Sequence, residues 1–467
     1  MITINFEENK NIGLCESIYQ SIKKQIQQGI LKADEKLPSK RSFSEHLGVS
    51  VITVQNAYGL LIDEGWIYSI EKKGFFVTDI SNHFLPKKIE EQIFDGENEV
   101  QQRILADFVS NSINIEKFPF TVWARLTRKV LNSQDKVLLS KQTVWGLSSL
   151  RQAIQEYLYE YRGINVKTSQ IVIGAGTESL YTMIVQFFGA NNIFALENPG
   201  YKKVAKIIKL NNSKFVPIEI DSEGINIEDL ENSNANIVHV SPSHHFPTGI
   251  IMSAKRRNLL LQWAMKNENR FIIEDEYDSE FRFVGKPLAP LFSSANSEKV
   301  IYINTFSKTV SPSLRISYMI LPQSLISKFD EKMNFISCPV SAIEQLTLAS
   351  FIKEGHFETH ITRMRNYYRN IRNEFIYQLN QSSLSKNVII LEEDSGLQFL
   401  LEIKTMHNQE KIKTRLLEKG IIINFLSDYE YDNCLNQNLK NTMGINYSGI
   451  EKNKIKQIIS AIEHAII

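Results

Sequence analysis

The sequence predicts an α/β protein in which a small helical head with a β-hairpin precedes a much larger body. From about residue 103 to the end, helical segments alternate with short apolar runs, a pattern typical of a mostly parallel sheet covered by helices on both faces. Residues 1–78 instead show helical periodicity followed by two strand-like runs. At 467 residues the chain is too long for one hydrophobic core, so two or three domains are expected.

The composition is that of a soluble globular protein, with 43% hydrophobic and 22% charged residues. No apolar run approaches the roughly 18 residues of a membrane span, and the first ten residues lack the apolar core of a signal peptide. Cys15, Cys338 and Cys434 are odd in number and far apart, which favours neither a disulfide framework nor a metal site. We therefore expect a cytoplasmic protein without a metal and without membrane contact.

The head has the element order of a winged helix-turn-helix. Leu14, Ile18, Ile22 and Ile26 recur every four positions and predict a first helix that ends at Gly29. A short helix follows over about 39–47, then a turn at Gly48 and a third helix from about residue 50, in which four apolar residues are expected to face inward: Val54, Ala57, Leu61 and Ile62. Strand-like runs over 66–70 and 75–78 flank a turn made of Lys72, Lys73 and Gly74.

Several polar residues of the head are placed for DNA contact. Ser39 and Arg41 begin a helix, where backbone amides and a guanidinium can bind a phosphate. Ser50 and Thr53 begin the third helix, which is expected to enter the major groove and to read base edges through Gln55 and Asn56. The turn residues Lys72, Lys73 and Gly74 suit the DNA backbone or the minor groove.

The alternative is a small helical domain with a polar surface, and the charge balance supports it, because the head carries nine basic and nine acidic residues. The motifs LPSKR, GVS-x-x-TV-x-x-A and LL-x-EG favour DNA binding, since over residues 10–78 they resemble the GntR-type winged helix. Residues 79–102 are polar and predict a linker, so that the expected domains are 1–78, the linker 79–102, and 103–467.

Four motifs follow one another in the large domain. GAGTES starts at Gly174, ENPGY ends at Tyr201, RFIIEDEY contains Asp275, and TFSKTVSPSLR contains Lys308. Across about 360 residues they resemble the aminotransferase-like domain of fold-type I proteins that depend on pyridoxal 5'-phosphate (PLP). The resemblance implies PLP as the cofactor, a large domain with a mostly parallel, seven-stranded type of sheet between helices, and a small α+β lobe from about Val388.

The resemblance also implies a role for each motif residue. Lys308 follows a strand and would form the Schiff base, while Asp275 would pair with the ring nitrogen and keep it protonated. Tyr277 would reach the phenolic oxygen of the cofactor, and Tyr201 would stack on its ring. A further set would hold the phosphate through side chains and backbone amides: Gly176, Thr177, Glu178, Thr305, Ser307 and Arg315. Singly, a lysine after a strand is usually solvated, and an Asp there usually caps a helix.

Two departures from the resembled family bear on the ligand. Phe246 stands before PTG, where aminotransferases commonly have Asn; His244 or His245 is a substitute unless both are buried structural residues. Gly444 stands where many relatives have an Arg that binds the α-carboxylate of an amino acid, and Lys203 is the nearest replacement.

The order of head and body resembles the MocR/GabR regulator family. It implies a homodimer, with heads swapped across the dimer as one arrangement, a double-stranded DNA operator, and a small-molecule effector that is PLP itself or an amine or amino acid. The expected output is transcription with little or no turnover. The alternative is a catalytically active aminotransferase, acting on amino acids and keto acids, that carries a DNA-binding head.

Overall fold

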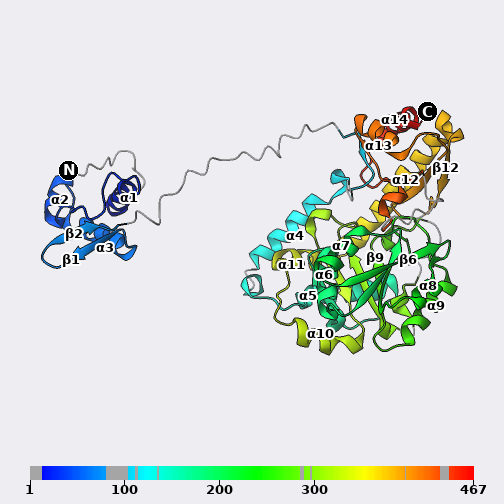
Figure 1. The fold of residues 1–467 in the computed structure, drawn as a ribbon, viewed down its shortest axis with the longest axis horizontal. Coiled ribbons are helices and arrows are strands. Elements are labelled where there is room, and N and C mark those ends of the chain that lie inside the picture. The colour runs from blue at the N-terminus through cyan, green and yellow to red at the C-terminus, as the bar shows by residue number, and fades with distance from the viewer. Residues whose placement is uncertain are drawn as a thin grey trace. The chain divides into compact units, whose positions relative to one another are not determined.

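The computed structural model describes residues 13–79, 104–110, 114–133, 136–283, 289–294, 297–394, 396–431 and 441–466. The chain divides into two compact units, Met1–Val100 and Gln101–Ile467 (Figure 1). The predicted linker, apart from Asp79, and Cys434 lie outside the described residues. No helix of the described part is long and apolar enough to cross a membrane.

The head contains three helices and a two-stranded antiparallel hairpin: α1 (Leu14–Gln27), α2 (Lys40–Leu47), α3 (Val51–Asp63), β1 (Ile67–Ile70) and β2 (Gly74–Val77). Serine side chains cap the second and third helices, because Ser39 Oγ accepts from the amide of Ser42 at 3.2 Å and Ser50 Oγ accepts from that of Thr53 at 3.1 Å. Gly48 ends α2 in the left-handed conformation (φ 65°), which turns the chain into α3.

One apolar core holds the head together. Ile18, Ile22 and Ile26 of α1 pack against α3, as the four-residue spacing predicts, whereas Leu14, the first residue of the helix, is 50% exposed. The expected inward face of α3 was wrong at one position, since Ile62 is 38% exposed and Tyr58 is buried instead. Positions 54, 57, 58 and 61 share one face of a helix with 3.6 residues per turn, whereas residue 62 lies 100° beyond position 61.

The large unit is built on an eight-stranded sheet in the order β4-β11-β10-β9-β8-β5-β6-β7. The strands are β4 (Ile171–Gly174), β5 (Ile193–Asn198), β6 (Lys214–Asp221), β7 (Gly224–Ile225), β8 (Ile237–Val240), β9 (Phe271–Glu276), β10 (Val300–Thr305) and β11 (Ser317–Ile320). Neighbours from β10 to β6 run parallel, while β11 is antiparallel to both β10 and β4, and the two-residue β7 is antiparallel to β6. The predicted fold class is confirmed, with the short β7 added to a sheet of seven longer strands.

Helices cover both faces of this sheet (Figure 1). One apolar cluster joins the sheet to α5 (Ser148–Arg162), α9 (Ala254–Met265) and α11 (Ala342–Lys353). The other joins it to α6 (Thr177–Phe188), α7 (Lys202–Leu210) and α10 (Ile326–Met333). The remaining large-domain helices are α4 (Phe120–Asn132), α8 (Ile227–Asn232) and the 26-residue α12 (His356–Gln381).

A small C-terminal lobe carries a three-stranded antiparallel sheet of β12 (Val388–Leu391), β13 (Gln398–Ile403) and β15 (Thr442–Asn446), with helices α13 (Gln409–Glu418) and α14 (Ile455–Ile466). The segment IIINF, whose apolar run predicts one continuous strand, forms the shorter β14 (Ile421–Ile422) and, at Phe425, an isolated antiparallel bridge to Met443. The partner of β14 is β3 (Ala106–Asp107), which runs parallel to it and is the first strand in the described part of the large unit. This pairing brings residues 104–110 against the small lobe.

Candidate cofactor pocket and DNA-binding surface

A cavity of about 610 Å³ lies beyond the carboxyl ends of the parallel strands β9 and β10, where α/β folds bind ligands. Nine of the ten residues predicted for the cofactor line it: Thr177, Glu178, Tyr201, Asp275, Tyr277, Thr305, Ser307, Lys308 and Arg315. The tenth, Gly176, lies against Arg315, because a Cβ added to Gly176 would come within 2.5 Å of the guanidinium. The structure thus brings together residues that are up to 139 positions apart in the chain.

Lys308 lies three residues after the end of β10 and is 7% exposed. Burial disfavours the charged ammonium and lowers the pKa of Lys308 to about 8, although the nearby Asp278 carboxylate opposes the shift. A neutral amine is the form that attacks an aldehyde, so this environment makes the nucleophilic form available near neutral pH.

The rate at which the apoprotein captures PLP should therefore rise with pH through a midpoint near 8, because the pKa of Lys308 is lowered to about 8 and only the neutral amine reacts. Asp278→Asn removes the carboxylate that favours the ammonium, so the midpoint should move to lower pH. Stopped-flow absorbance at fixed PLP concentration measures both profiles. A midpoint near 10.5, the ordinary value for lysine, would contradict the assignment.

Asp275, on β9, presents a carboxylate with one free oxygen. Oδ2 accepts a hydrogen bond of 2.5 Å from the hydroxyl of Tyr181, which also lies 2.8 Å from Nε2 of His239. Oδ1 is buried and has no hydrogen-bond partner among the described residues. An unpartnered buried carboxylate oxygen in a cavity wall needs a donor, and a protonated ring nitrogen is a suitable one. On this observation the pocket fits PLP.

Tyr181 and His239 were not predicted from the sequence. Tyr181 lies on α6, where it reads as one more apolar residue of the buried face, and His239 lies inside the apolar strand β8. Only the fold brings them to Asp275.

The residues expected to bind the phosphate of the cofactor bring cations and backbone amides together. Arg315 pairs with Glu178 at 2.6 Å, and Lys203 pairs with the same carboxylate at 3.3 Å. Helix α6 begins at Thr177, directly after Gly176 (φ 85°). No side chain caps this end of the helix, so its first backbone amides are available to an anion. Thr305 Oγ1 instead accepts from the amide of Ser307 at 3.1 Å and from the hydroxyl of Ser317 at 2.8 Å, which fixes the loop before Lys308.

Four aromatic rings meet at the cavity. The ring of Phe246 lies edge-on to those of Tyr201, Tyr277 and Tyr429, with centroid distances of 5.7, 6.3 and 5.0 Å. Tyr429 comes from the small lobe and was not predicted. Phe246 therefore gives this side of the pocket an apolar contact where an Asn would give a polar one.

The two histidines before Phe246 do not line the cavity. His244 Nδ1 lies 3.0 Å from Oδ1 of Asp278, and although burial opposes its charge, this carboxylate raises the pKa of His244. Burial lowers the pKa of His245 to about 3, and its Nδ1 lies 2.7 Å from the hydroxyl of Thr248. Both are buried structural residues, and Asp278, held by His244, is the group that reaches the cavity.

In the head, the residues predicted for DNA contact are on the surface. Arg41, Gln55, Asn56, Lys72 and Lys73 are all exposed. The hydroxyls of Ser39 and Ser50 cap helices, so part of their role is structural, and Thr53 shares the cap of α3 through a 2.8 Å contact between its hydroxyl and that of Ser50. Lys72 adopts the left-handed conformation (φ 61°) at the tip of the hairpin, followed by Gly74 (φ 116°).

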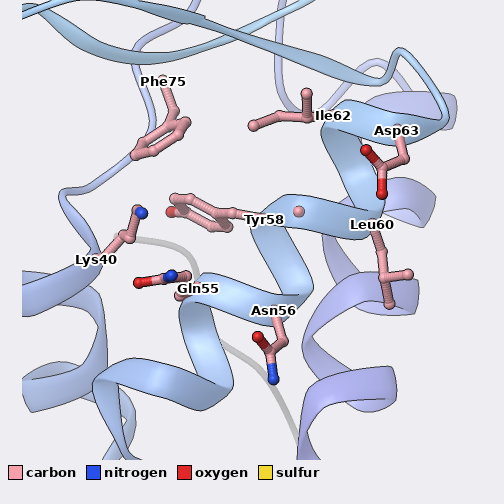
Figure 2. Close-up of a pocket in the computed structure, with 9 residues that line it drawn as sticks. Lys40, Gln55, Asn56, Tyr58, Leu60, Ile62, Asp63 and Phe75 are labelled. Atoms are coloured by element: carbon pink, nitrogen blue, oxygen red, sulfur yellow. The ribbon is translucent and has the colours of Figure 1, made fainter.

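A hollow of about 530 Å³ lies along α3, at the place where Phe75 of the hairpin packs against Tyr58. Figure 2 shows Lys40, Gln55 and Phe75 around the ring of Tyr58, whereas Asn56 points away from that ring. The ammonium of Lys40 lies 5.4 Å from the centroid of Phe75. Gln55 and Asn56 thus face different sides of α3 and are expected to meet different groups of a DNA duplex.

Two kinds of substitution in the head should have different signatures. Arg41→Ala should weaken binding to all sequences about equally and reduce the salt slope by about one, since it removes one phosphate contact. Gln55→Ala or Asn56→Ala should each cost about 1–3 kcal/mol at particular base pairs. Fluorescence anisotropy with operator and scrambled duplexes separates the two, with Lys24→Ala, an exposed cation of α1, as the control. Unchanged operator affinity of Arg41→Ala at physiological salt would contradict this docking.

Comparison with known proteins gives the class of each unit. The family model of bacterial regulatory proteins, gntR family, matches residues 14–77, and that of aminotransferase class I and II matches residues 105–462. The kynurenine aminotransferase of Pyrococcus horikoshii has a similar fold, with a TM-score of 0.68 and 22% identity over 78% of this chain and 91% of that structure.

Two relatives extend over nearly the whole chain. The uncharacterized HTH-type transcriptional regulator YdeL of Bacillus subtilis (strain 168) is 34% identical over 465 residues, 99% of each protein. The HTH-type pyridoxine biosynthesis transcriptional regulator PdxR of Corynebacterium glutamicum is 28% identical over 428 residues, 92% of this chain and 91% of that protein. The chain belongs to the MocR/GabR-type regulators, in which a GntR-type DNA-binding head is fused to an aminotransferase-like domain whose cofactor is PLP.

Proposed function

We propose that this protein controls transcription by sensing PLP, or an amine or amino acid that meets PLP, through Lys308 in the aminotransferase-like domain. The observation that carries the proposal is the shared cavity of a buried Lys308 with lowered pKa, an Asp275 carboxylate with a free oxygen, and Arg315. Occupancy of this cavity would change the affinity of the head for a double-stranded operator.

Each group of the cofactor would be bound by different residues of the pocket. When bound, PLP supplies an aldehyde that links covalently to an amine and a ring that accepts electrons. Lys308 would hold the aldehyde, Asp275 the proton on the ring nitrogen, and Tyr277 the phenolic oxygen, while Tyr201 would cover the ring. The phosphate would lie among the hydroxyl of Ser307, the guanidinium of Arg315, and the backbone amides at Gly176, Thr177 and Glu178, and Thr305 would support this site by holding the amide of Ser307.

A second candidate is a working aminotransferase. Its support is the complete set of Lys308, Asp275 and Tyr277 in one cavity, which a pure sensor of free PLP does not need. The lack of a cation at Gly444 favours the sensor, because a buried carboxylate needs a paired charge. Steady turnover of amino-acid and keto-acid pairs, together with no binding to DNA upstream of its own gene, would favour the enzyme.

The setting we propose is a cytoplasmic homodimer, whose two heads would contact two operator half-sites. The relative PdxR is named as a regulator of pyridoxine biosynthesis, which supports a form of vitamin B6 as the signal here.

The proposed function is tested by adding PLP to the apoprotein and measuring its affinity for DNA upstream of its own gene. A tenfold change corresponds to about 1.4 kcal/mol of coupling between the pocket and the head. Equal DNA affinity of the apoprotein and of the PLP form, before and after addition of amines and amino acids, would contradict the proposal.

A further inference from the structure

The small lobe supplies one wall of the cofactor pocket. We call it the amide wall: it consists of Gln398, Asn424 and Asn446, which all line the cavity together with Tyr429. Gln398 starts β13 and Asn446 ends β15, and the two residues are paired across the sheet. None of the motif residues expected to bind PLP belongs to this wall, so it faces the part of the cavity left for another ligand.

In each side chain of the amide wall, one of the two polar groups of the amide forms hydrogen bonds within the protein. Nε2 of Gln398 donates to the carbonyl of Pro247 at 2.9 Å, and Nδ2 of Asn424 donates to the hydroxyl of Tyr429 at 3.1 Å. Oδ1 of Asn446 accepts from the amide and the hydroxyl of Ser448, at 3.0 and 2.6 Å. The other ends, two carbonyl oxygens and one NH2 group, have no partner within the described part of the chain. The wall therefore offers both acceptors and a donor in fixed orientation.

The charges of the cavity are poorly arranged for a carboxylate at this wall. The cations that line the cavity all come from the large domain: they are Lys202, Lys203, Lys308 and Arg315. Lys203 and Arg315 share the carboxylate of Glu178, and Lys308 is committed to the cofactor. The carboxylate of Asp278 also lines the cavity and would repel an anion.

Gly444 leaves room for a cation without supplying one. It lies on β15 two residues before Asn446 and so on the same face of the strand, and its amide donates to the carbonyl of Asn424 at 3.4 Å. A Cβ added to Gly444 would have no atom within 4 Å. The amide wall is thus spacious and neutral.

We propose that the amide wall selects an amine that carries hydroxyl groups and no carboxylate. The inference rests on the proposed function, since the amine of such a ligand would meet the cofactor at Lys308. Hydroxyls both donate and accept, which matches the free ends of Gln398, Asn424 and Asn446, whereas a carboxylate would leave the two carbonyl oxygens facing a like charge.

Matched pairs of small amines test this on the full-length protein loaded with PLP. The pairs are 2-amino-1-propanol with alanine and 3-amino-1-propanol with β-alanine, so that each pair differs only in a hydroxymethyl or carboxylate group. The readout is the half-saturating concentration for the shift of the absorption band of the bound cofactor. We expect a value at least tenfold lower for each amino alcohol than for its amino acid. A preference for the amino acid, or no shift with any of the four compounds, would overturn the inference.

Gly444→Arg is the second test, with Gly444→Met as a control that adds length without charge. The arginine variant should lower the half-saturating concentration of alanine at least tenfold, and the methionine variant should not. Equal responses of the two variants would overturn the inference even if the wild-type preference held. A protein that forms no lysine-linked cofactor band at all would contradict the proposed function itself, which keeps the two failures distinct.

Discussion

Lys308→Ala is expected to abolish the covalent link between the protein and PLP. The wild-type protein should be yellow, and borohydride should move its absorption band and leave the cofactor attached through dialysis and denaturation. Lys308 is the buried lysine among those that line the cavity, and burial lowers its pKa to about 8, so its neutral, nucleophilic amine is available near neutral pH.

The matched control is Lys202→Ala, which removes a lysine that also lines the cavity but lies on the first turn of α7. This variant should keep the reducible band. Mass spectrometry of the reduced protein identifies the modified residue. A reducible lysine adduct in Lys308→Ala would show that another lysine holds the cofactor.

Arg315→Met is expected to weaken PLP binding at least about 30-fold. The Arg315 side chain is 50% exposed in the structure, so the expected loss comes from its contacts with the phosphate, to which a guanidinium can donate two parallel hydrogen bonds worth about 1.5–3 kcal/mol each. The substitution would also leave the carboxylate of Glu178 beside the cofactor phosphate without its closer cation. Absorbance titration of the apoprotein measures the dissociation constant.

Lys203→Met is the control for Arg315→Met, because the lysine pairs with the same Glu178 carboxylate. Its side chain is 60% exposed and its contact is longer, at 3.3 Å, so the expected loss is small. A PLP affinity of Arg315→Met within threefold of wild type would contradict the phosphate role.

In the large sheet, the sequence predicted the strands that are apolar throughout and missed those that are not. The apolar runs of β4, β5, β8, β9, β10 and β11 are continuous, because both of their faces are covered. Strand β6 was missed, since it is partly exposed and contains Pro217. The two-residue β3 has no pattern of its own and is extended only because β14 pairs with it.

The same distinction applies to the candidate site. Lys308 and Asp275 could be predicted because their motifs, at or just after the ends of apolar strands, follow the order found in the PLP-dependent proteins that the chain resembles, and the carboxyl ends of parallel strands lie on the ligand side. Tyr181 and Asp278 could not, because their importance depends on contacts with Asp275 and His244. The amide wall depends on the pairing of Gln398 with Asn446, which are 48 residues apart and carry no local motif.

The pairing of β3 with β14 joins the start of the large unit to the wall of the cavity. At the start of the described part of the large unit, the amide of Leu105 donates to the carbonyl of Gly420 at 2.8 Å and that of Phe108 donates to the carbonyl of Ile422 at 3.0 Å. Directly afterwards Val109 and Ser110 line the cavity. A two-residue ladder costs little free energy to open. A ligand that displaces Val109 and Ser110 is therefore expected to strain the short β3–β14 ladder, so that a change in the cavity reaches the start of the large unit.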